Sequence, residues 1–560
     1  MKYRNPIIFA DYSDPDVIRV GDTFYMTASS FNYTPGLPIL VSKDLVNWEL
    51  KNYALENIGQ DRFKIPRHSE GVWAPAIRFH NGVFYIYYGM PDEGYYVVRT
   101  RDPLGKWDEP VCVLEGKGLI DPCPFWDEDG KAYIIHGYAK SRIGIKSILG
   151  IFERNPDGTR AISEDHFIFD GNAPEHPAVT IEGPKVYKRN GYYYILAPAG
   201  GVKHGYQVAL RSRDIRGPYE IKTVMEQGNT VINGPHQGGL VDTERGDEWF
   251  IHFQDRGLYG RICHLQPVTW KDDLPVIGAI PEGEDNTSNE GTCGYPVYEH
   301  EMPNCNVGVF VSHDKENNLQ LPHQVIETFR NGRPGHSWQW LGDHDVSFAG
   351  TIPGSDGIRL FSLNPSGDAE PILWRSANVF TQKLVYPVFK TQITIDASGL
   401  KDSERAGVCM MGGQYVTAYI RREADEYYIC VAESEGGDRD KKEIIKKSWS
   451  LDELCQRYNV KVDDYVKEFG FNMIFTYKDR KFDSKDLYFR NVDEPLFGEN
   501  PSLYMALDFA NGQEPFDLGV KFMPSDHTWV GAKLGIYALC DNDGKDHGFA
   551  DFKAVVTEEL

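Results

Sequence analysis

The sequence lacks the features of a membrane-spanning or nucleic-acid-binding protein. It contains no run of 18 or more apolar residues, which a membrane-spanning helix requires. Its first residues, 1–6, lack the apolar core of a signal peptide. Basic side chains number 59 against 82 acidic ones, and the net charge of -23 disfavours polyanionic partners. We therefore expect no nucleic-acid or membrane partner, a cytoplasmic location if the chain is complete, and a periplasmic or secreted one if a leader was removed.

Cysteine is also sparse and unpatterned. The nine cysteines are scattered, their number is odd, and none of them forms a CxxC pair. This favours small buried thiols in a reducing compartment over a disulfide framework or a zinc site. Cys293 and Cys305 are the pair to check for a disulfide.

Aromatic residues and turn formers are abundant. Aromatic side chains make up 13% of the 560 residues, accompanied by 55 Gly and 33 Pro. This mixture favours strands and tight turns over long helices. The length predicts more than one domain.

One short phrase recurs five times in the first half of the chain. Each copy has a turn glycine beside a polar residue, followed by aromatic and β-branched residues. The glycines are 48 to 61 residues apart, at Gly21, Gly82, Gly130, Gly191 and Gly246. Each copy reads as a hairpin turn and a strand. Five such units predict a five-bladed β-propeller over residues 1–300, with an all-β sandwich of chance internal similarity as the alternative.

The regularity ends near residue 280, and the rest of the chain has a different pattern. Residues 301–324 are predicted to be a linker, and strand-like segments fill residues 325–560. Only 451–458 suggests a short helix. The pattern predicts an all-β protein whose second domain is a concanavalin-like β-sandwich of two antiparallel sheets. We expect this sandwich to bury apolar surface against the propeller and to send a loop over the mouth of its pocket.

Five functional side chains share one phase of the repeat. They stand seven to ten residues before the turn glycines, and they are Asp14, Trp73, Asp121, Glu182 and His236. The innermost strands of a propeller line one central channel, so residues at the same phase converge there. The sequence therefore predicts three carboxylates, a tryptophan and a histidine around one end of the channel.

Three inward carboxylates suit the hydrolysis of a glycosidic bond. That reaction needs a carboxylic acid to protonate the leaving oxygen and an ionised carboxylate to activate water or attack carbon. A third carboxylate would raise the pKa of the acid by like-charge repulsion. A single Asp-Pro, by contrast, is ordinary turn chemistry. The spacing alone does not choose between retention and inversion, because that depends on the carboxylate separation.

The same motifs resemble glycoside hydrolase family 43. The resemblance is carried by Asn5-Pro6-Ile7, Ser13-Asp14-Pro15-Asp16, Trp73-Ala74-Pro75, Asp121-Pro122, Thr180-Ile181-Glu182-Gly183-Pro184 and His236-Gln237-Gly238-Gly239. It covers essentially the whole chain and is most specific over 1–300. Within the family the chain is most similar to two-domain β-xylosidases and α-L-arabinofuranosidases.

The resemblance implies a role for each matching residue. Asp14 corresponds to the general base, Glu182 to the general acid, and Asp121 to the residue that tunes and orients the acid, with inversion at the anomeric carbon. Phe31 and Trp73 correspond to walls of the sugar pocket, and Arg261 to a cation that binds the non-reducing sugar. His236 corresponds to a substrate-site histidine that in many members lies near a calcium or sodium ion. No cofactor is required for the chemistry.

These implications leave several functions to separate. The first is an exo-acting inverting β-xylosidase that releases terminal D-xylose from xylo-oligosaccharides. The second is an α-L-arabinofuranosidase, or a dual-specificity enzyme, acting on arabinoxylan or arabinan. A non-catalytic sugar-binding propeller and a protein-binding scaffold are alternatives of other classes. Phe31 and Trp73 have blade packing as their structural alternative, Arg261 an ion pair between blades, and His236 a core position. A homo-oligomer is compatible with all of these readings.

Overall fold

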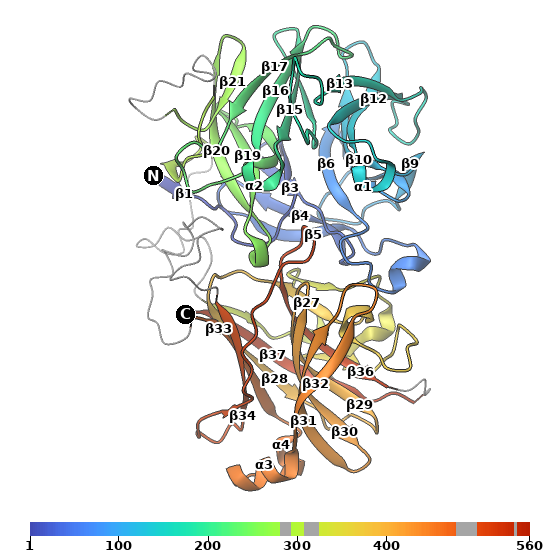
Figure 1. The fold of residues 1–560 in the computed structure, drawn as a ribbon, viewed down its shortest axis with the longest axis vertical. Helices are drawn as coiled ribbons and strands as arrows, with labels where there is room; N and C mark the ends of the chain where they lie inside the picture. The colour runs from blue at the N-terminus through green and yellow to red at the C-terminus, as the bar shows by residue number, and fades with distance from the viewer. Residues whose placement is uncertain (281–292, 307–323, 478–500, 542–545) are drawn as a thin grey trace.

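The computed structural model describes residues 1–280, 293–306, 324–477, 501–541 and 546–560. Two all-β bodies lie one above the other (Figure 1). The first is a ring of five four-stranded antiparallel sheets, and the second consists of two larger sheets. The predicted fold class is confirmed. The linker predicted over 301–324 lies largely outside the described residues, as do the polar residues 281–292.

Each blade of the propeller comes from one continuous stretch of chain, ordered from the innermost strand outward. The blades are β2 (Asp16–Val20), β3 (Thr23–Thr27), β4 (Gly36–Ser42) and β5 (Glu49–Leu55); β6 (Trp73–His80), β7 (Val83–Met90), β8 (Gly94–Thr100) and β9 (Val111–Glu115); β10 (Leu119–Trp126), β11 (Ala132–Tyr138), β12 (Ile148–Arg154) and β13 (His166–Asp170); β14 (Lys185–Arg189), β15 (Tyr192–Ala199), β16 (Tyr206–Ser212) and β17 (Glu220–Met225); and β18 (His236–Asp242), β19 (Glu248–Asp255), β20 (Arg261–Lys271) and β21 (Leu274–Ile277). Two short helices, α1 (Lys140–Ile143) and α2 (Gly201–His204), lie in the connections of the third and fourth blades.

The five repeat glycines occupy the turns between the first and second strands of the blades. Their φ angles are all positive, from 64° at Gly21 to 89° at Gly246. Asn81 and Asn190, each before a repeat glycine, also have a φ of 50°. Two successive positive φ values suit the tight hairpin turns that match the twist of the strands. The repeat therefore marks the inner hairpin of every blade, as predicted.

The ring closes where the last blade meets the first. The innermost strands β18 and β2 lie side by side, and the N-terminal segment crosses the last blade. There Asn5 Nδ2 donates to Leu265 O at 2.8 Å, and Ile8 forms an antiparallel bridge with Cys263. In addition, β1 (Lys2–Arg4) pairs with β22 (Glu299–Glu301). In the described residues each blade takes its four strands from one continuous stretch of chain, so these contacts hold the two ends of the propeller together.

The second body is a sandwich of two antiparallel sheets. One contains β25 (Ala349–Thr351), β26 (Ile358–Phe361), β37 (Phe549–Glu559), β28 (Phe389–Asp396), β33 (Phe469–Thr476), β34 (Ser502–Asp508) and β35 (Phe516–Asp517), with β23 (Gln324–Glu327) also paired to β37. The other contains β24 (Trp338–Trp340), β27 (Phe380–Lys383), β36 (Lys533–Cys540), β29 (Glu404–Met411), β30 (Tyr415–Glu423), β31 (Glu426–Glu435) and β32 (Lys442–Ser450). The predicted short helix is α3 (Leu451–Tyr458), and α4 (Val462–Tyr465) follows it. Alternate residues of the strands form a large apolar core.

The sandwich and the propeller share buried surface. Phe31 and Trp73 of the propeller belong to the same apolar cluster as Trp374, Tyr415 and Val530 of the sandwich. Figure 1 shows the chain between β35 and β36 rising from the sandwich to the propeller. The expectation that apolar surface is buried between the two is therefore confirmed.

Two further expectations concern the chain as a whole. All nine cysteines lie in the described residues, and no disulfide joins any of them, Cys293 and Cys305 included. Among the residues that the structure describes, no helix has the length and apolar character needed to span a membrane.

Candidate active site

Asp14 lies just before the innermost strand of the first blade, in a shell of hydrogen-bond donors. Its backbone has a φ of 55°, and its side chain is buried. The hydroxyls of Ser13 and Ser29 both donate to Oδ2, at 2.8 and 2.6 Å. Nη1 of Arg261 lies 3.3 Å from Oδ1. Both oxygens of the Asp14 carboxylate are thus held by side chains of the propeller.

Asp121 lies in the innermost strand of the third blade and is more deeply buried. Its Oδ2 accepts a hydrogen bond from the backbone N–H of Gly183 at 2.7 Å and a longer one from Gln237 Nε2 at 3.4 Å. Gly183 follows Glu182, and Gln237 follows His236. A side chain at 183 would collide with Gln237, because its Cβ would lie 2.6 Å from Cδ of that residue. The glycine in Ile181-Glu182-Gly183-Pro184 thus permits the contact that orients Asp121.

The three carboxylates interact electrostatically. Burial, together with the nearby charges of Glu182 and Asp14, raises the pKa of Asp121 to about 8. Like charges in a desolvated site cannot all be ionised without a large cost. The structure therefore brings Asp14, Asp121 and Glu182 together at one end of the channel, in three different environments.

Glu182 is the most accessible of the three acids. Its side chain retains 35% of its exposed surface, and its Oε1 lies 2.8 Å from Nε2 of His236. His236 is itself buried at the first position of β18. The histidine thus holds the carboxyl group from the neighbouring blade and leaves the rest of the side chain open to a ligand.

Phe31 and Trp73 form an apolar wall beside the acids. Phe31 has a φ of 52° and is bridged to Val72 by two backbone hydrogen bonds of 2.9 and 3.0 Å. Trp73 Nε1 donates to Ser69 O at 3.0 Å, and the guanidinium of Arg142, in α1, lies 5.2 Å from the Trp73 ring. Both rings share a cluster with Ile120, the neighbour of Asp121.

Arg261 begins the third strand of the fifth blade and points to Asp14. Besides that carboxylate, Nη1 donates to Ser13 Oγ at 2.7 Å, Nε lies 3.6 Å from Asp255 Oδ2, and the guanidinium stacks over Phe253 at 4.6 Å. The side chain is thus an ion-pair partner of Asp14 as well as a cation at the site.

The sandwich reaches this end of the propeller. The ring of Trp529 meets that of Trp73 edge to face, with centroids 4.7 Å apart, and 36% of Trp529 remains exposed. The neighbouring residues His527 and Thr528 hydrogen-bond to Ser69 Oγ at 2.8 and 2.7 Å. Trp529 therefore extends the wall made by Phe31 and Trp73.

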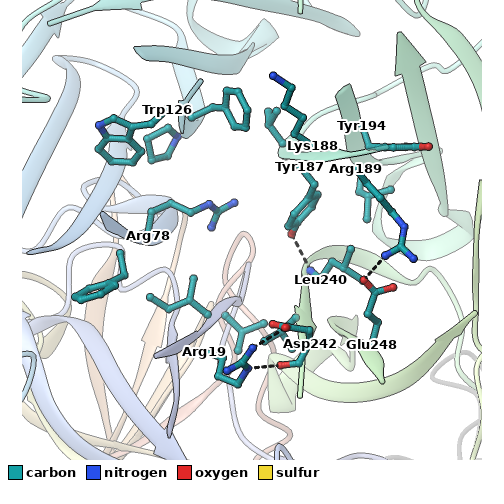
Figure 2. Close-up of a pocket in the computed structure, with 18 of the residues that line it drawn as sticks. Arg19, Arg78, Trp126, Tyr187, Lys188, Arg189, Tyr194, Leu240, Asp242 and Glu248 are labelled. Atoms are coloured by element: carbon teal, nitrogen blue, oxygen red, sulfur yellow. Dashed lines mark hydrogen bonds and ion pairs between the residues drawn. The ribbon is translucent and has the colours of Figure 1, made fainter. Parts of the chain in front are cut away.

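The opposite mouth of the channel is lined by paired charges. The C-terminal halves of the five innermost strands line a cavity of about 480 Å³ there (Figure 2). Its cations are matched by carboxylates: Arg19 by Asp242 at 2.6 Å, Arg189 by Glu248 at 2.7 Å, Arg78 by Asp16 at 2.5 Å, and Lys188 by Asp127 at 2.6 Å. At this mouth each of these cations has its own carboxylate, whereas at the other end three carboxyl groups lie close enough together to raise the pKa of Asp121.

The donor set around His236 does not fit a calcium cage built from protein side chains. Calcium takes six to eight oxygen ligands, whereas His236 contributes one nitrogen and its Nε2 is bonded to Glu182. In the described ranges, no three His, Cys, Asp or Glu side chains are grouped so that they could hold a metal ion.

Several contributors to the site were not predicted. Ser13 adjoins Asp14, and Ser29 lies two residues before Phe31, so their closeness in sequence to predicted site residues was a usable signal. Gln237 directly follows His236, so its closeness to a predicted site residue was a usable signal as well. Arg142 and Trp529 carried no local signal, because α1 and the sandwich loop reach the site only through the fold.

The raised pKa of Asp121 predicts a pH-dependent effect on stability. The unfolded chain has an ordinary aspartate pKa of about 3.9, so folding disfavours the ionised form, and stability is lost as pH rises from about 4 through about 8. Asn does not ionise. Asp121→Asn is therefore expected to unfold about 2–5 °C above the wild type at pH 8.5, with a smaller difference at pH 4.5. Thermal unfolding at both pH values measures this, and a variant less stable at pH 8.5 contradicts it.

Two family models match most of the chain between them. Residues 3–275 match the family model described as glycosyl hydrolases family 43, and residues 326–482 match the β-xylosidase C-terminal concanavalin A-like domain. The β-xylosidase of Formosa agariphila is 30% identical over 602 residues, covering 98% of this chain and 89% of that protein. A protein of Xylanibacter ruminicola is 39% identical over 347 residues, or 60% of this chain and 62% of that protein.

Two other proteins extend the comparison. A non-reducing end α-L-arabinofuranosidase of Bacteroides ovatus is 33% identical over 296 residues, covering 49% of this chain and 53% of that protein. The structure of a xylan β-1,4-xylosidase from Bacillus halodurans C-125 superposes with a TM-score of 0.76 at 19% identity, covering both chains completely, and so shares the fold. The full-length similarity and the family model together show that the chain belongs to glycosyl hydrolase family 43.

Proposed function

We propose that the protein is an exo-acting, inverting glycosidase that removes terminal D-xylose from xylo-oligosaccharides. The observation that carries this proposal is the set of three carboxylates in unlike environments at one end of the channel. Asp14 is surrounded by donors, Asp121 is buried with a raised pKa, and Glu182 is partly exposed. Unlike environments are what separate an acid from a base in carboxylate pairs.

In this mechanism Asp14 acts as the general base. It takes a proton from a water molecule as the water oxygen attacks the anomeric carbon. The bond from that carbon to the glycosidic oxygen breaks, and the leaving oxygen takes the proton of Glu182. The hydroxyls of Ser13 and Ser29 orient the carboxylate of Asp14.

Asp121 supports the acid. Its carboxyl is fixed by the N–H of Gly183, the residue after Glu182, so the two side chains keep a constant relation. Two carboxyl groups in one desolvated site cannot both ionise without a large cost, so the pair of Asp121 and Glu182 keeps a proton that can pass to the leaving oxygen. His236 fixes one oxygen of Glu182.

The aromatic wall supports action at the chain end. Phe31, Trp73 and Trp529 surround the side of the site next to the acids, and Trp529 comes from the second domain. A wall built from two domains closes one side of the site to a continuing polysaccharide. The faces of such rings also match the apolar face of a sugar ring.

Removal of α-L-arabinofuranose is the second candidate. It is favoured by the similarity to the Bacteroides ovatus arabinofuranosidase, which covers 49% of this chain. Since the same three carboxylates serve either sugar, the choice depends on how the wall and Arg261 meet the hydroxyls.

The proposal is tested with two chromogenic substrates and one oligosaccharide. Nitrophenol release from the β-D-xylopyranoside is expected to exceed release from the α-L-arabinofuranoside by about 10-fold or more, the discrimination typical of small differences in sugar contacts. Xylotetraose should yield xylose and xylotriose first, with the α-anomer of xylose formed first in NMR spectra. Comparable rates on both chromogenic substrates would indicate dual specificity, and no release above background from either one rejects both candidates.

A further inference from the structure

Asp11 lies buried at the junction of the propeller and the sandwich, where both of its carboxylate oxygens are used. Oδ1 accepts a hydrogen bond from the backbone N–H of Arg261 at 3.0 Å. Oδ2 accepts from the backbone N–H of Gly531 and from Nζ of Lys533, both at 3.1 Å. One carboxylate thus binds the fifth blade with one oxygen and the sandwich with the other.

The blade side of this junction leads directly to Asp14. Arg261 accepts a backbone hydrogen bond from Tyr12 at 2.9 Å, and its guanidinium contacts Ser13 Oγ and Asp14 Oδ1. The backbone of Arg261 is therefore fixed by Asp11 and Tyr12, and its side chain by the two residues that follow them. A displacement of Asp11 moves the cation that holds Asp14.

The backbone at the junction has no room for other side chains. Gly260 has a φ of 75°, and a Cβ on it would lie 2.3 Å from Cγ of Asp11. A Cβ on Gly531 would lie 2.4 Å from the backbone nitrogen of Gly260. Two glycines from different domains thus allow the chains to meet around the carboxylate, which marks a close-fitting contact.

Asp11 and Lys533 form an ion pair that is buried at the domain junction. Burial raises the pKa of Asp11, but Lys533 and Lys383 outweigh burial, so its pKa is lowered and the carboxylate stays ionised. Burial and the neighbouring Lys533 lower the pKa of Lys383 to about 7, and its Nζ lies 4.9 Å from the ring of Tyr12. A buried ion pair contributes little net stability because desolvation offsets attraction, whereas removing one partner is costly. The contribution of this ion pair is therefore to hold Arg261 and the sandwich in fixed positions relative to each other.

We infer that Asp11 is a positioning residue that couples the sandwich to the base of the active site. It holds Arg261, and through it Asp14, in a position set by Gly531 and Lys533 of the second domain. The inference rests on the proposed function, because it takes Asp14 as the general base. It gives the sandwich a part in the chemistry in addition to the wall of Trp529.

The test is Asp11→Asn, measured with the nitrophenyl glycoside that the wild type hydrolyses better. The amide oxygen of Asn can accept a hydrogen bond either from Arg261 or from Gly531 and Lys533. Its NH2 group then faces the remaining donors, to which it cannot hydrogen-bond. We expect kcat to fall about 10- to 100-fold, as for a small misplacement of a reacting group, with KM changed less than about 3-fold. The acidic limb of the kcat/KM profile should move to higher pH, because the guanidinium then stabilises the charge of Asp14 less.

Asp343→Asn is the matched control. Asp343 belongs to the sandwich and accepts hydrogen bonds from the backbone N–H groups of Ile58 and Gly59 of the propeller, at 2.7 and 2.8 Å. It thus crosses the same domain junction but does not contact Arg261. We expect its kcat to stay within about 2-fold of the wild type and its pH profile to be unchanged, since it touches no reacting group.

A second variant keeps the inference testable if Asp11→Asn does not fold. Lys533→Met removes one sandwich partner and leaves the bonds of Asp11 to Arg261 and Gly531, so the same pH shift is expected at smaller size. Equal loss of kcat in Asp11→Asn and Asp343→Asn overturns the inference. An unchanged pH profile in Asp11→Asn also overturns it. If only Lys533→Met folds, an unchanged pH profile in that variant overturns it. An active wild type with such a result leaves the proposed function standing. An inactive wild type rejects both.

Discussion

Glu182→Gln is expected to lower kcat on xylobiose by about 10³- to 10⁴-fold, the range that general acid catalysis supplies. The amide keeps the size of the side chain and can still hydrogen-bond to His236, whose Nε2 lies 2.8 Å from Oε1. It has no proton to give to the leaving sugar hydroxyl. Steady-state kinetics measure the loss, and KM should change little, because protonation develops in the transition state.

The leaving group provides the internal control for Glu182. The dinitrophenolate of a dinitrophenyl xyloside leaves as a stable anion and needs little protonation. The fall in kcat of Glu182→Gln on this substrate should therefore be about 10-fold or less. Glu248→Gln makes the same chemical change at the opposite mouth of the channel, where Glu248 pairs with Arg189, and should keep kcat within about 2-fold. Equal losses on xylobiose and on the dinitrophenyl substrate would mean that Glu182 is not the acid.

Asp14→Asn is expected to lower kcat by about 10³-fold or more on every substrate, whatever the leaving group. The amide can still accept hydrogen bonds from Ser13 and Ser29, so the geometry of the loop should persist. It cannot take a proton from water, and activation of water is needed for good and poor leaving groups alike. Rates on xylobiose and on the dinitrophenyl xyloside together measure this.

Binding and a matched variant separate catalysis from structure at Asp14. Calorimetric titration with xylose should give a Kd within about 3-fold of the wild-type value, because Asp14 acts on water. Asp242→Asn, at the far mouth beside Arg19, should keep kcat within about 2-fold. A loss in Asp14→Asn that disappears on the dinitrophenyl substrate would assign the acid role to Asp14 and reverse the proposal.

Local sequence signals were enough to predict the propeller. Gly21 and Gly246 mark turns because a positive φ is cheap for glycine, and both have it. The alternation of the strands and the short helix at 451–458 are also local properties. Because the repeat sets the phase of each inner strand, it also predicted which side chains would line one end of the channel.

Contacts between distant parts of the chain could not be predicted from the sequence. Arg261 and Asp14 are 247 residues apart, and no periodicity relates them. Trp529 meets Trp73 only because a sandwich loop crosses to the propeller. Asp11 carries no local signal, because its two sets of partners come from different domains.

The sequence by itself determined the all-β class, the five blades, the second domain and the phase of Asp14, Asp121 and Glu182, because turns and strand alternation are encoded within a few residues. Only the tertiary structure decided how these carboxylates differ. Burial raises the pKa of Asp121, Arg261 reaches Asp14, and His236 fixes Glu182. Desolvation and charge interactions depend on which groups meet in space, and that is a property of the folded chain.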